Sequence, residues 1–406
     1  MQKNKLRAYA RLIARIGANV KKGQDVVISA ELDQPEFIAV LTDECYKAGA
    51  AKVTVQWSYQ PLEKIHTRHA SVKRLGEVEE WEKARLEHRV QTLPAMIYII
   101  SDDPDGLNGV NVEKYSKASS ARRSVIKPYR DRMDNKYQWC IAAVPGAKWA
   151  KKLFPELRVS SAVEKLWEVI LAASRADVDP IAQWEAHNAD LKNRCERLNS
   201  LGITSLHYTA SNGTDFTIGL IPGSRFVGGA EPTLDGQVFN ANIPSEEVFT
   251  SPMRNKANGK VVASMPLSYQ GQLIEGFWFI FKDGKVVEYH ADKNEELLGK
   301  LLEMDDSSSY LGECALVPYS SPIRKTGILF YNTLFDENAA CHLALGDSYP
   351  ETLVGFESMT REELKERGMN SSVIHEDFMI GTSDMNIDAV CSDGNTVPIF
   401  INGNWA

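Results

Sequence analysis

The sequence predicts two halves of different architecture: an open α/β domain with a parallel sheet over residues 1–195, and a mainly antiparallel β domain with helices over residues 196–406. In the first half, apolar strand-like runs alternate with helical stretches. In the second half, the chain changes to short β-rich runs broken by Gly, Asn and Pro. We therefore expect an α/β domain followed by an α+β domain, with the boundary near residue 195.

The first elements form a strand-helix-strand unit. Apolar residues at helical spacing predict a helix over residues 5–21, and Asp25–Ala30 is typical of a short buried strand. Pro35 favours the start of a second helix, which ends at Gly49. Lys52–Ser58 alternates between apolar and polar residues and predicts the next strand. Because such a crossover joins parallel strands, the sheet of the first half should be parallel.

Two further apolar runs extend this pattern. Met96–Ile100 and Trp139–Val144 predict strands, and long charged helical stretches separate them. Asp179–Leu198 is typical of a charged amphipathic helix and should link the two halves. Pro145–Lys148 lacks the glycine spacing and the hydroxyl of a phosphate loop, and the chain has no dinucleotide-binding fingerprint.

The second half consists mainly of short predicted strands. They are His207–Thr209, Asp215–Ile218, Val261–Pro266, Gly276–Lys282, Val286–Tyr289, Gly327–Asn332 and Thr396–Ile401. Asp283-Gly284 between two alternating runs predicts a tight hairpin. Helices are expected over Asn294–Asp305 and Thr360–Arg367.

The composition restricts the classes of partner. The 406 residues are 43% hydrophobic and 25% charged, which is ordinary for a globular protein. The net charge of -8 argues against nucleic acid, because phosphate binding usually requires a basic surface. No segment approaches the length of apolar sequence that spans a bilayer, and the charged first 22 residues resemble neither a signal peptide nor an anchor. We expect neither a nucleic-acid nor a membrane partner.

The six cysteines are scattered, without a CxxC pair or regular spacing. This distribution predicts reduced, mostly buried thiols rather than a disulfide framework. We expect a cytoplasmic protein from the charged N-terminus and the lack of a spanning segment. Cys314 and Cys341 adjoin candidate metal ligands, but we interpret both as small core residues.

Four clusters of acidic residues and histidines stand out in the second half. They lie in Asn242–Thr250, Leu311–Cys314, Leu334–His342 and Val373–Phe378. Each lies among apolar residues, where an ionised carboxylate is costly unless a cation compensates it. Carboxylates mixed with imidazoles suit hard and borderline divalent cations. A hydrolase with a carboxylate-rich pair of metal ions is therefore the first hypothesis.

The spacing within each cluster limits which side chains can act together. His375 and Asp377 share one face if they lie on a strand, and Glu376 then points away; the alternative is a surface strand with a salt bridge. Glu337 and His342 would lie about 140° apart on a straight helix, so the chain must turn between them if both bind one metal site. The alternative for His342 is a core histidine bonded to a backbone carbonyl.

The residues of the other two clusters allow more than one interpretation. Glu246 and Glu247 precede an extended run, so at most one of them can point into a given site. Glu313 stands near the start of a buried strand, where a carboxylate is either functional or a structural exception. The remaining histidines, including His66 and His69, have no convincing set of ligands around them and are interpreted as structural.

With these residues in view, the chain resembles the aminopeptidase T and aminopeptidase S family of bacterial metallopeptidases over its whole length. The motifs that carry the resemblance occur in the family's order. They are Asn242–Pro252, Leu311–Glu313, Tyr331–Gly346, Tyr349 and His375–Asp377, with Asn212–Asp215 and Leu220 upstream.

The resemblance implies a two-metal exopeptidase site in the second half, which would be the catalytic domain. The implied metal ligands are Glu247, Glu313, Glu337, His342, His375 and Asp377. It also implies Tyr349 as a catalytic residue, together with the carboxylates of Glu313 and Glu247, and favours Glu247 over Glu246 as the ligand. Two divalent ions per chain are expected, zinc first, with cobalt, manganese or magnesium as alternatives.

The activity that the resemblance implies is the removal of N-terminal residues from peptides with a free N-terminus, by a homodimer whose active site lies in an internal cavity. Glu313 would bridge the two ions, which activate water near neutral pH. Tyr349 would donate to the oxyanion, and Glu246, Glu247 or Glu313 would transfer the proton to the leaving amine. The alternatives are a dinuclear dipeptidase or deacylase, and a non-catalytic peptide- or metal-binding protein.

Overall fold

The computed structural model describes residues 3–406, and among these its contacts divide the chain into two compact units. The first comprises the residues up to Glu185 together with Ala230–Pro244, and the second comprises Ala186–Gly229 and Ser245–Ala406. This grouping differs from the expected 1–195 and 196–406, because residues 230–244 return to the first unit. The reason is a short strand there that joins the parallel sheet.

The first unit contains a parallel sheet, as predicted. In spatial order its strands are β2 (Lys52–Ser58), β1 (Asp25–Glu31), β3 (Ala95–Ile100), β4 (Trp139–Ala143) and β9 (Asn242–Ile243). β1 pairs in parallel with β2 and β3, and β4 pairs in parallel with β3 and β9. The strands β1, β3 and β4 are buried for most of their length, which explains their continuous apolar sequences.

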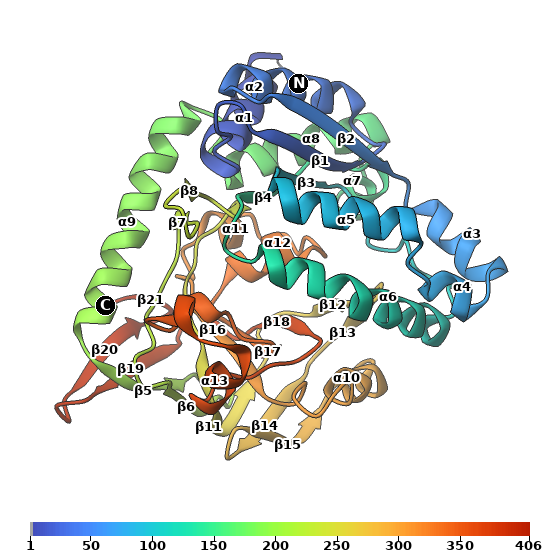
Figure 1. Cartoon of the computed structure of the whole chain (residues 1–406). Coiled ribbons are helices and arrows are strands. Elements are labelled where there is room, and N and C mark those ends of the chain that lie inside the picture. Colours follow the sequence, from blue (N-terminus) through green and yellow to red (C-terminus); the bar gives the residue numbers. More distant parts are fainter. Residues whose placement is uncertain (1–2) are drawn as a thin grey trace. The chain divides into compact units, whose positions relative to one another are not determined.

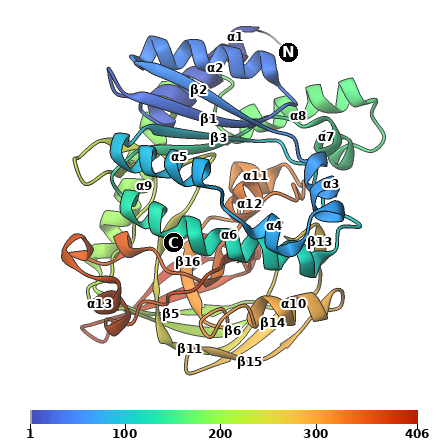
Figure 2. The same cartoon turned by 45° about the vertical axis from the view of Figure 1, so that its right-hand side comes forward.

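Helices cover both faces of this sheet. The helices of this unit are α1 (Lys3–Leu12), α2 (Pro35–Ala48), α3 (Pro61–His69), α4 (Val72–Gly76), α5 (Glu80–Thr92), α6 (Val112–Met133), α7 (Ala147–Leu153) and α8 (Val159–Ala173). Figures 1 and 2 show α1 and α2 on one face and α5 and α6 on the other. α2 starts at Pro35 and ends at a left-handed Gly49, as its sequence predicts. The helix expected over residues 5–21 is shorter, since α1 passes into one wide π-helical turn at Ile13–Gly17.

Helix α9 (Pro180–Ser200) matches the predicted linking helix and spans the boundary between the units. The first unit also contains a small two-stranded ribbon of β7 (Glu231–Pro232) and β8 (Val238–Phe239). No helix among residues 3–406 is long and apolar enough to cross a membrane.

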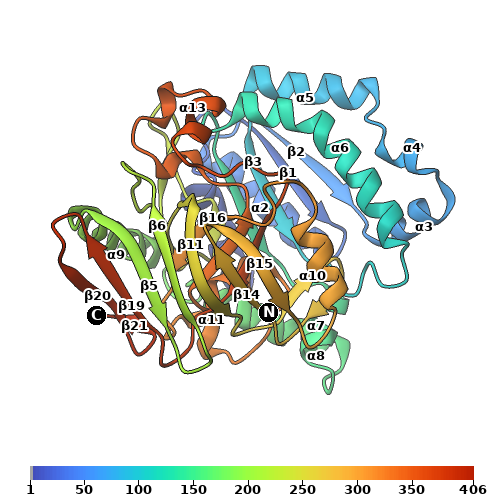
Figure 3. The same cartoon turned by 90° about the horizontal axis from the view of Figure 1, so that it is seen from below.

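The second unit is mainly antiparallel β, as predicted. Its larger sheet has the order β15 (Lys285–His290), β14 (Trp278–Lys282), β11 (Pro252–Val262), β6 (Asp215–Leu220), β5 (Ile203–Thr209), β19 (Asn386–Cys391), β20 (Thr396–Ile401) and β21 (Asn404–Trp405). Figure 3 shows most of these strands side by side. Asp283 and Gly284 have positive φ angles of 49° and 85° in the β14–β15 turn, which is the conformation that the Asp-Gly pair predicted.

A smaller antiparallel sheet carries most of the candidate ligands. Its order is β10 (Val248–Thr250), β16 (Leu311–Leu316), β17 (His342–Gly346) and β18 (His375–Met379). One hydrophobic core joins residues of both sheets, including Phe216 and Phe279 from the larger one and Leu343 and Phe378 from the smaller one. A two-stranded ribbon of β12 (Leu267–Tyr269) and β13 (Gln272–Ile274) completes the β structure.

Short helices connect these strands. They are α10 (Glu295–Leu302), α11 (Pro322–Lys325), α12 (Thr333–Asp336), α13 (Arg361–Glu366) and the single turns Glu337–Ala339, Pro350–Thr352 and Phe356–Ser358. The prediction of a strand over Gly327–Asn332 is wrong. The carboxylate of Asp336 accepts the N–H groups of Phe330 and Asn332 at 2.8 and 2.9 Å, so this backbone forms a capped loop instead.

Candidate metal centre

The register of the smaller sheet places four candidate ligands on one face. Glu313 of β16 and Asp377 of β18 lie opposite Ala344, on either side of it. Paired residues of neighbouring strands share a face, and so do residues two apart along one strand. His342 and His375 therefore lie on the same face as Glu313 and Asp377. This confirms the alternation predicted for His375 and Asp377.

The opposite face of the same sheet belongs to the hydrophobic core. Cys314, Leu343 and Phe378 alternate with the ligands along their strands, and each is at most 1% exposed. All six cysteines are free and buried, as predicted. The packing of this apolar face fixes the position of the three strands, and with them the polar side chains on the other face.

The other two candidate ligands come from loops beside this sheet. Glu247 directly precedes β10 and is 8% exposed. Glu337 lies in the turn after α12, and the chain extends again before His342 begins β17. The change of direction required between Glu337 and His342 is therefore present.

Glu313 lies between the two histidines. His342 Nε2 is 3.2 Å from Glu247 Oε2 and 3.8 Å from Glu313 Oε1. His375 Nε2 is 3.0 Å from Glu313 Oε2 and 3.5 Å from Asp377 Oδ1. Each oxygen of the Glu313 carboxylate thus faces a different imidazole.

Backbone carbonyls orient both imidazoles. His375 Nδ1 lies 2.8 Å from the carbonyl oxygen of Asp347, and His342 Nδ1 lies 3.3 Å from that of Ala340. A proton on each Nδ1 leaves Nε2 with a lone pair toward the carboxylates. This arrangement is typical of metal-binding histidines, whose second nitrogen is usually held by such a partner.

The structure contains two overlapping groups that can hold a metal ion. One consists of Glu247, Glu313 and His342, and the other of Glu313, His375 and Asp377; within each, the ligand atoms lie within 4.8 Å of one another. Glu313 belongs to both. No other such group occurs among residues 3–406. The donor atoms are oxygen and imidazole nitrogen, which fit zinc and harder divalent cations.

Two of the buried carboxylates, those of Glu313 and Glu337, have raised pKa values in the metal-free chain. Burial would also raise the pKa of Asp377, but the neighbouring imidazoles, that of His375 first, outweigh burial and lower this pKa instead. Burial raises the pKa of Glu313 to about 7, an effect that contact with His375 opposes and the charge of Glu247 reinforces. Burial, followed by the charges of Asp377 and Glu247, holds the pKa of Glu337 well above its usual range. The influence of these charges on Glu337 shows that its carboxylate faces the same cluster, although it belongs to neither group.

The histidines favour their charged forms. Burial disfavours an imidazolium, yet the contact with Glu247 raises the pKa of His342 to about 10. Burial likewise opposes protonation of His375, but the charges of Asp377 and Glu313 hold its pKa well above the usual value. In the absence of a metal ion, protons on these imidazoles therefore compensate part of the negative charge.

Tyr349 lies beside the cluster of candidate ligands, next to His375. Its ring centroid lies 4.7 Å from that of His375 and 5.6 Å from that of Phe249. The residue as a whole is 38% exposed. Desolvation and the charges of the nearby carboxylates, Glu313 first, raise the pKa of Tyr349 well above its usual value. The hydroxyl is thus a proton donor over the whole physiological pH range.

The remaining acidic residues of the clusters lie outside both groups. Glu246 is buried beside Glu247, and Glu376 lies opposite Leu345, on the core-side face of the sheet. Two further side chains hold the segment before Glu247: His187, one of the histidines interpreted above as lying outside any ligand set, and Asn338, which sequence reasoning missed. His187 Nε2 lies 2.7 Å from the carbonyl oxygen of Ser245, and Asn338 contacts the backbone of Glu246. The only signal for Asn338 was its place directly after Glu337.

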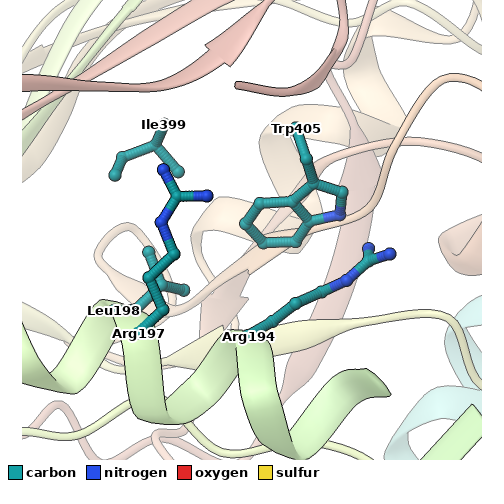
Figure 4. A pocket seen from close by; sticks show the side chains of 5 residues that line it. All are labelled: Arg194, Arg197, Leu198, Ile399 and Trp405. Atoms are coloured by element: carbon teal, nitrogen blue, oxygen red, sulfur yellow. The ribbon is translucent and has the colours of Figure 1, made fainter.

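A separate pocket of about 110 Å³ lies between α9 and the C-terminal strands (Figure 4). It is lined by Arg194, Arg197, Leu198, Ile399 and Trp405. The guanidinium of Arg194 lies 4.9 Å from the centre of the Trp405 ring. Two arginines without a carboxylate or imidazole in the lining make this pocket unsuitable for a metal cation.

Comparison with known proteins gives consistent matches over the full length. The profile of the family Peptidase_M29, described as thermophilic metalloprotease (M29), matches residues 2–405. The chain is 41% identical to aminopeptidase AmpS of Bacillus subtilis (strain 168) over 404 residues, which cover 99% of this chain and 98% of AmpS. It is also 41% identical to aminopeptidase PepS of Streptococcus thermophilus over 406 residues, with the same coverage of 99% and 98%.

The fold is likewise similar to that of a solved structure. Wild-type AmpT from Thermus thermophilus superposes with a TM-score of 0.92 at 37% sequence identity, covering 100% of this chain and 99% of AmpT. The predicted family resemblance and the predicted fold class are both confirmed.

Metal binding by the metal-free protein should release protons. The pKa of His342 is about 10 and that of His375 is well above its usual value, so both imidazoles are protonated at pH 8. A divalent cation must displace these protons, and we expect about two or more per chain at full occupancy. Because the released protons are products of the binding reaction, a lower proton concentration favours binding, and metal affinity should increase from pH 6 to pH 8.

Calorimetric titration with Zn²⁺ in two non-chelating buffers of different ionisation enthalpy measures this number. His207→Gln is the control, because His207 is an exposed histidine that pairs with Asp215 away from the cluster. It should leave the number of released protons unchanged. A binding enthalpy independent of the buffer would contradict the prediction.

Proposed function

Because the chain belongs to the M29 family of metalloproteases, we propose that it is an aminopeptidase that hydrolyses N-terminal residues from peptides with two divalent cations. The observation that carries this proposal is the place of Glu313 in both metal-binding groups. A carboxylate shared by two adjacent groups is what a bridged pair of ions requires. The names of the relatives AmpS and PepS, both called aminopeptidases, support the same activity.

The charge of the cluster supports two ions rather than one. Four carboxylates surround the two imidazoles: Glu247, Glu313, Glu337 and Asp377. With the histidines neutral, as metal ligands must be, two divalent cations balance four ionised carboxylates. A single cation would leave a net negative charge in a buried site, where it is costly.

The proposed ligands divide between the two ions. Glu247, Glu313 and His342 would hold one ion, and Glu313, His375 and Asp377 the other. Glu337 would complete one of these two sets. When bound, the ions supply activation of water near neutral pH and polarisation of the scissile carbonyl.

The protein groups supply the proton transfers and the oxyanion contact. The ring of Tyr349 packs beside those of His375 and Phe249, and we propose that its hydroxyl donates a hydrogen bond to the developing oxyanion. Transfer of a proton to the leaving amine requires a carboxylate, for which Glu246, Glu247 and Glu313 are the candidates. Glu246 is the one of these that neither metal-binding group uses.

The acidic character of the site also suits the substrate. A peptide with a free N-terminus carries a positive charge that carboxylates attract. We further propose a homodimer in the cytoplasm that uses zinc first and accepts cobalt, manganese or magnesium. The six free cysteines support a reducing compartment.

Removal of metal should abolish hydrolysis of aminoacyl fluorogenic substrates. Zinc, cobalt, manganese and magnesium should restore activity to different degrees, because oxygen and imidazole ligands discriminate weakly between these ions. The measurement is the initial rate after chelation, dialysis and addition of one metal at a time. Full activity in the metal-free protein would rule out the proposed mechanism. Cleavage of the same substrates with an acetylated N-terminus would favour a deacylase or another peptidase class.

Glu313→Gln should lose at least one metal ion and most of the turnover, because Glu313 is shared by both groups. Glu376→Gln is the matched control, since Glu376 lies on the other face of β18 and should keep both ions. Metal content by atomic emission and kcat on the same preparations test the pair. Equal metal content and equal rates in the two variants would exclude Glu313 as the bridge.

Tyr349→Phe should keep metal content and folding while lowering kcat by about 10²- to 10³-fold, the usual effect of losing one oxyanion donor. KM should change far less, because the interaction develops mainly in the transition state. The alternative is a tyrosine that only packs against the Pro350 turn, in which case Tm falls and kcat is retained. Measurement of kcat, KM, metal content and Tm on one preparation distinguishes the two, and a kcat within a few-fold of wild type would exclude the catalytic role.

A further inference from the structure

Asn338 connects two loops that carry proposed metal ligands. It lies in the turn Glu337–Ala339 and is completely buried. Its Oδ1 accepts the backbone N–H of Glu246 at 2.6 Å, across 92 residues of sequence. Its Nδ2 donates to the carbonyl of Leu334 at 2.9 Å and lies 3.4 Å from Oε1 of Glu337. One amide thus contacts the residue before Glu247 and the side chain of Glu337.

Electrostatic repulsion between Glu247 and Glu337 acts to push the two loops apart. Both carboxylates must be ionised to act as metal ligands, and beyond the effects of burial and of Asp377, the charge of Glu247 already raises the pKa of Glu337. Like charges at short distance repel more strongly where water is excluded. Neither loop is part of the ladder that aligns Glu313, His342, His375 and Asp377. Side chains hold the backbone of the loop that carries Glu247 at two successive residues. His187 contacts the Ser245 carbonyl, and Asn338 accepts the Glu246 N–H.

We propose that Asn338 is a positioning residue of the metal centre, which holds Glu247 and Glu337 at the distance that the cations require. This inference rests on the proposed two-metal function. The amide is suited to the task because it carries both an acceptor for Glu246 N–H and a donor for Glu337 and Leu334, without adding charge. A carboxylate at this place would add to the repulsion.

A simpler role for Asn338 is to cap the turn locally through Leu334, four residues earlier in the chain. Asn338→Ser separates the two roles. A serine hydroxyl can bond the carbonyl four residues before it, so the local contact is preserved. It is too short to replace the contact with Glu246 N–H. Positioning therefore predicts a loss of metal affinity in this variant, whereas local capping predicts none.

The test is titration of the metal-free protein with Co²⁺, followed by visible absorption and by competition with a chelator. We expect Asn338→Ser to weaken Co²⁺ binding by about 10- to 100-fold, the usual effect of losing a residue that orients a metal ligand. The visible spectrum should change as well, because the geometry around the ion changes. Saturating Co²⁺ should restore part of the lost kcat.

Thr214→Val is the matched control. The Thr214 hydroxyl is buried and accepts the backbone N–H of Val262 at 3.1 Å, away from the cluster. Both variants remove one side-chain acceptor from a backbone N–H, so both should lower Tm, but Thr214→Val should bind Co²⁺ like wild type. Wild-type affinity in Asn338→Ser, or an equal loss in both variants, would overturn the inference. Failure of the wild-type protein to bind two Co²⁺ ions would instead contradict the proposed function itself.

Discussion

Mutual repulsion among buried carboxylates is the constraint around which the second unit is organised. Glu247, Glu313, Glu337 and Asp377 approach one another in a region from which water is largely excluded. Such an arrangement is stable only if protons or cations compensate the charge and if the backbone cannot move apart. The raised pKa values of Glu313, Glu337 and both histidines show that protons do this in the metal-free chain.

The smaller sheet supplies the rigidity. Its three strands that carry candidate ligands bury Cys314, Leu343 and Phe378 on one face. A shift of the ladder by one residue would turn these side chains toward the polar cluster and the charged side chains into the hydrophobic core. On the polar face, Ala344 separates Glu313 from Asp377, and Ala315 lies beside His342. These small side chains do not project into the cluster as far as a larger residue would.

Local patterns in the sequence predicted much of this arrangement. Alternation around His375 predicted the shared face with Asp377, and the spacing of Glu337 and His342 predicted a turn between them. Patterns of this kind report only on neighbours along the chain. They could not show that Glu313 lies opposite Ala344, nor that residues 230–244 join the first unit through β9. The apolar run Gly327–Asn332 was misleading because a later residue, Asp336, binds its N–H groups. Asn338 was missed because its partner Glu246 is 92 residues away, and local patterns do not report on contacts at that separation.

The alternation of the strands also determines which elements enter the site. Cys314 follows Glu313 directly and Cys341 precedes His342, so both thiols are one residue from a candidate ligand. Cys314 points into the core because adjacent strand residues face opposite ways, and Cys341 Sγ donates to the carbonyl of Val317. Burial raises the pKa of each thiol to about 12, so neither supplies a thiolate. The candidate centre therefore offers oxygen and imidazole donors alone, and donor sets of that kind suit hard and borderline divalent cations rather than soft ones.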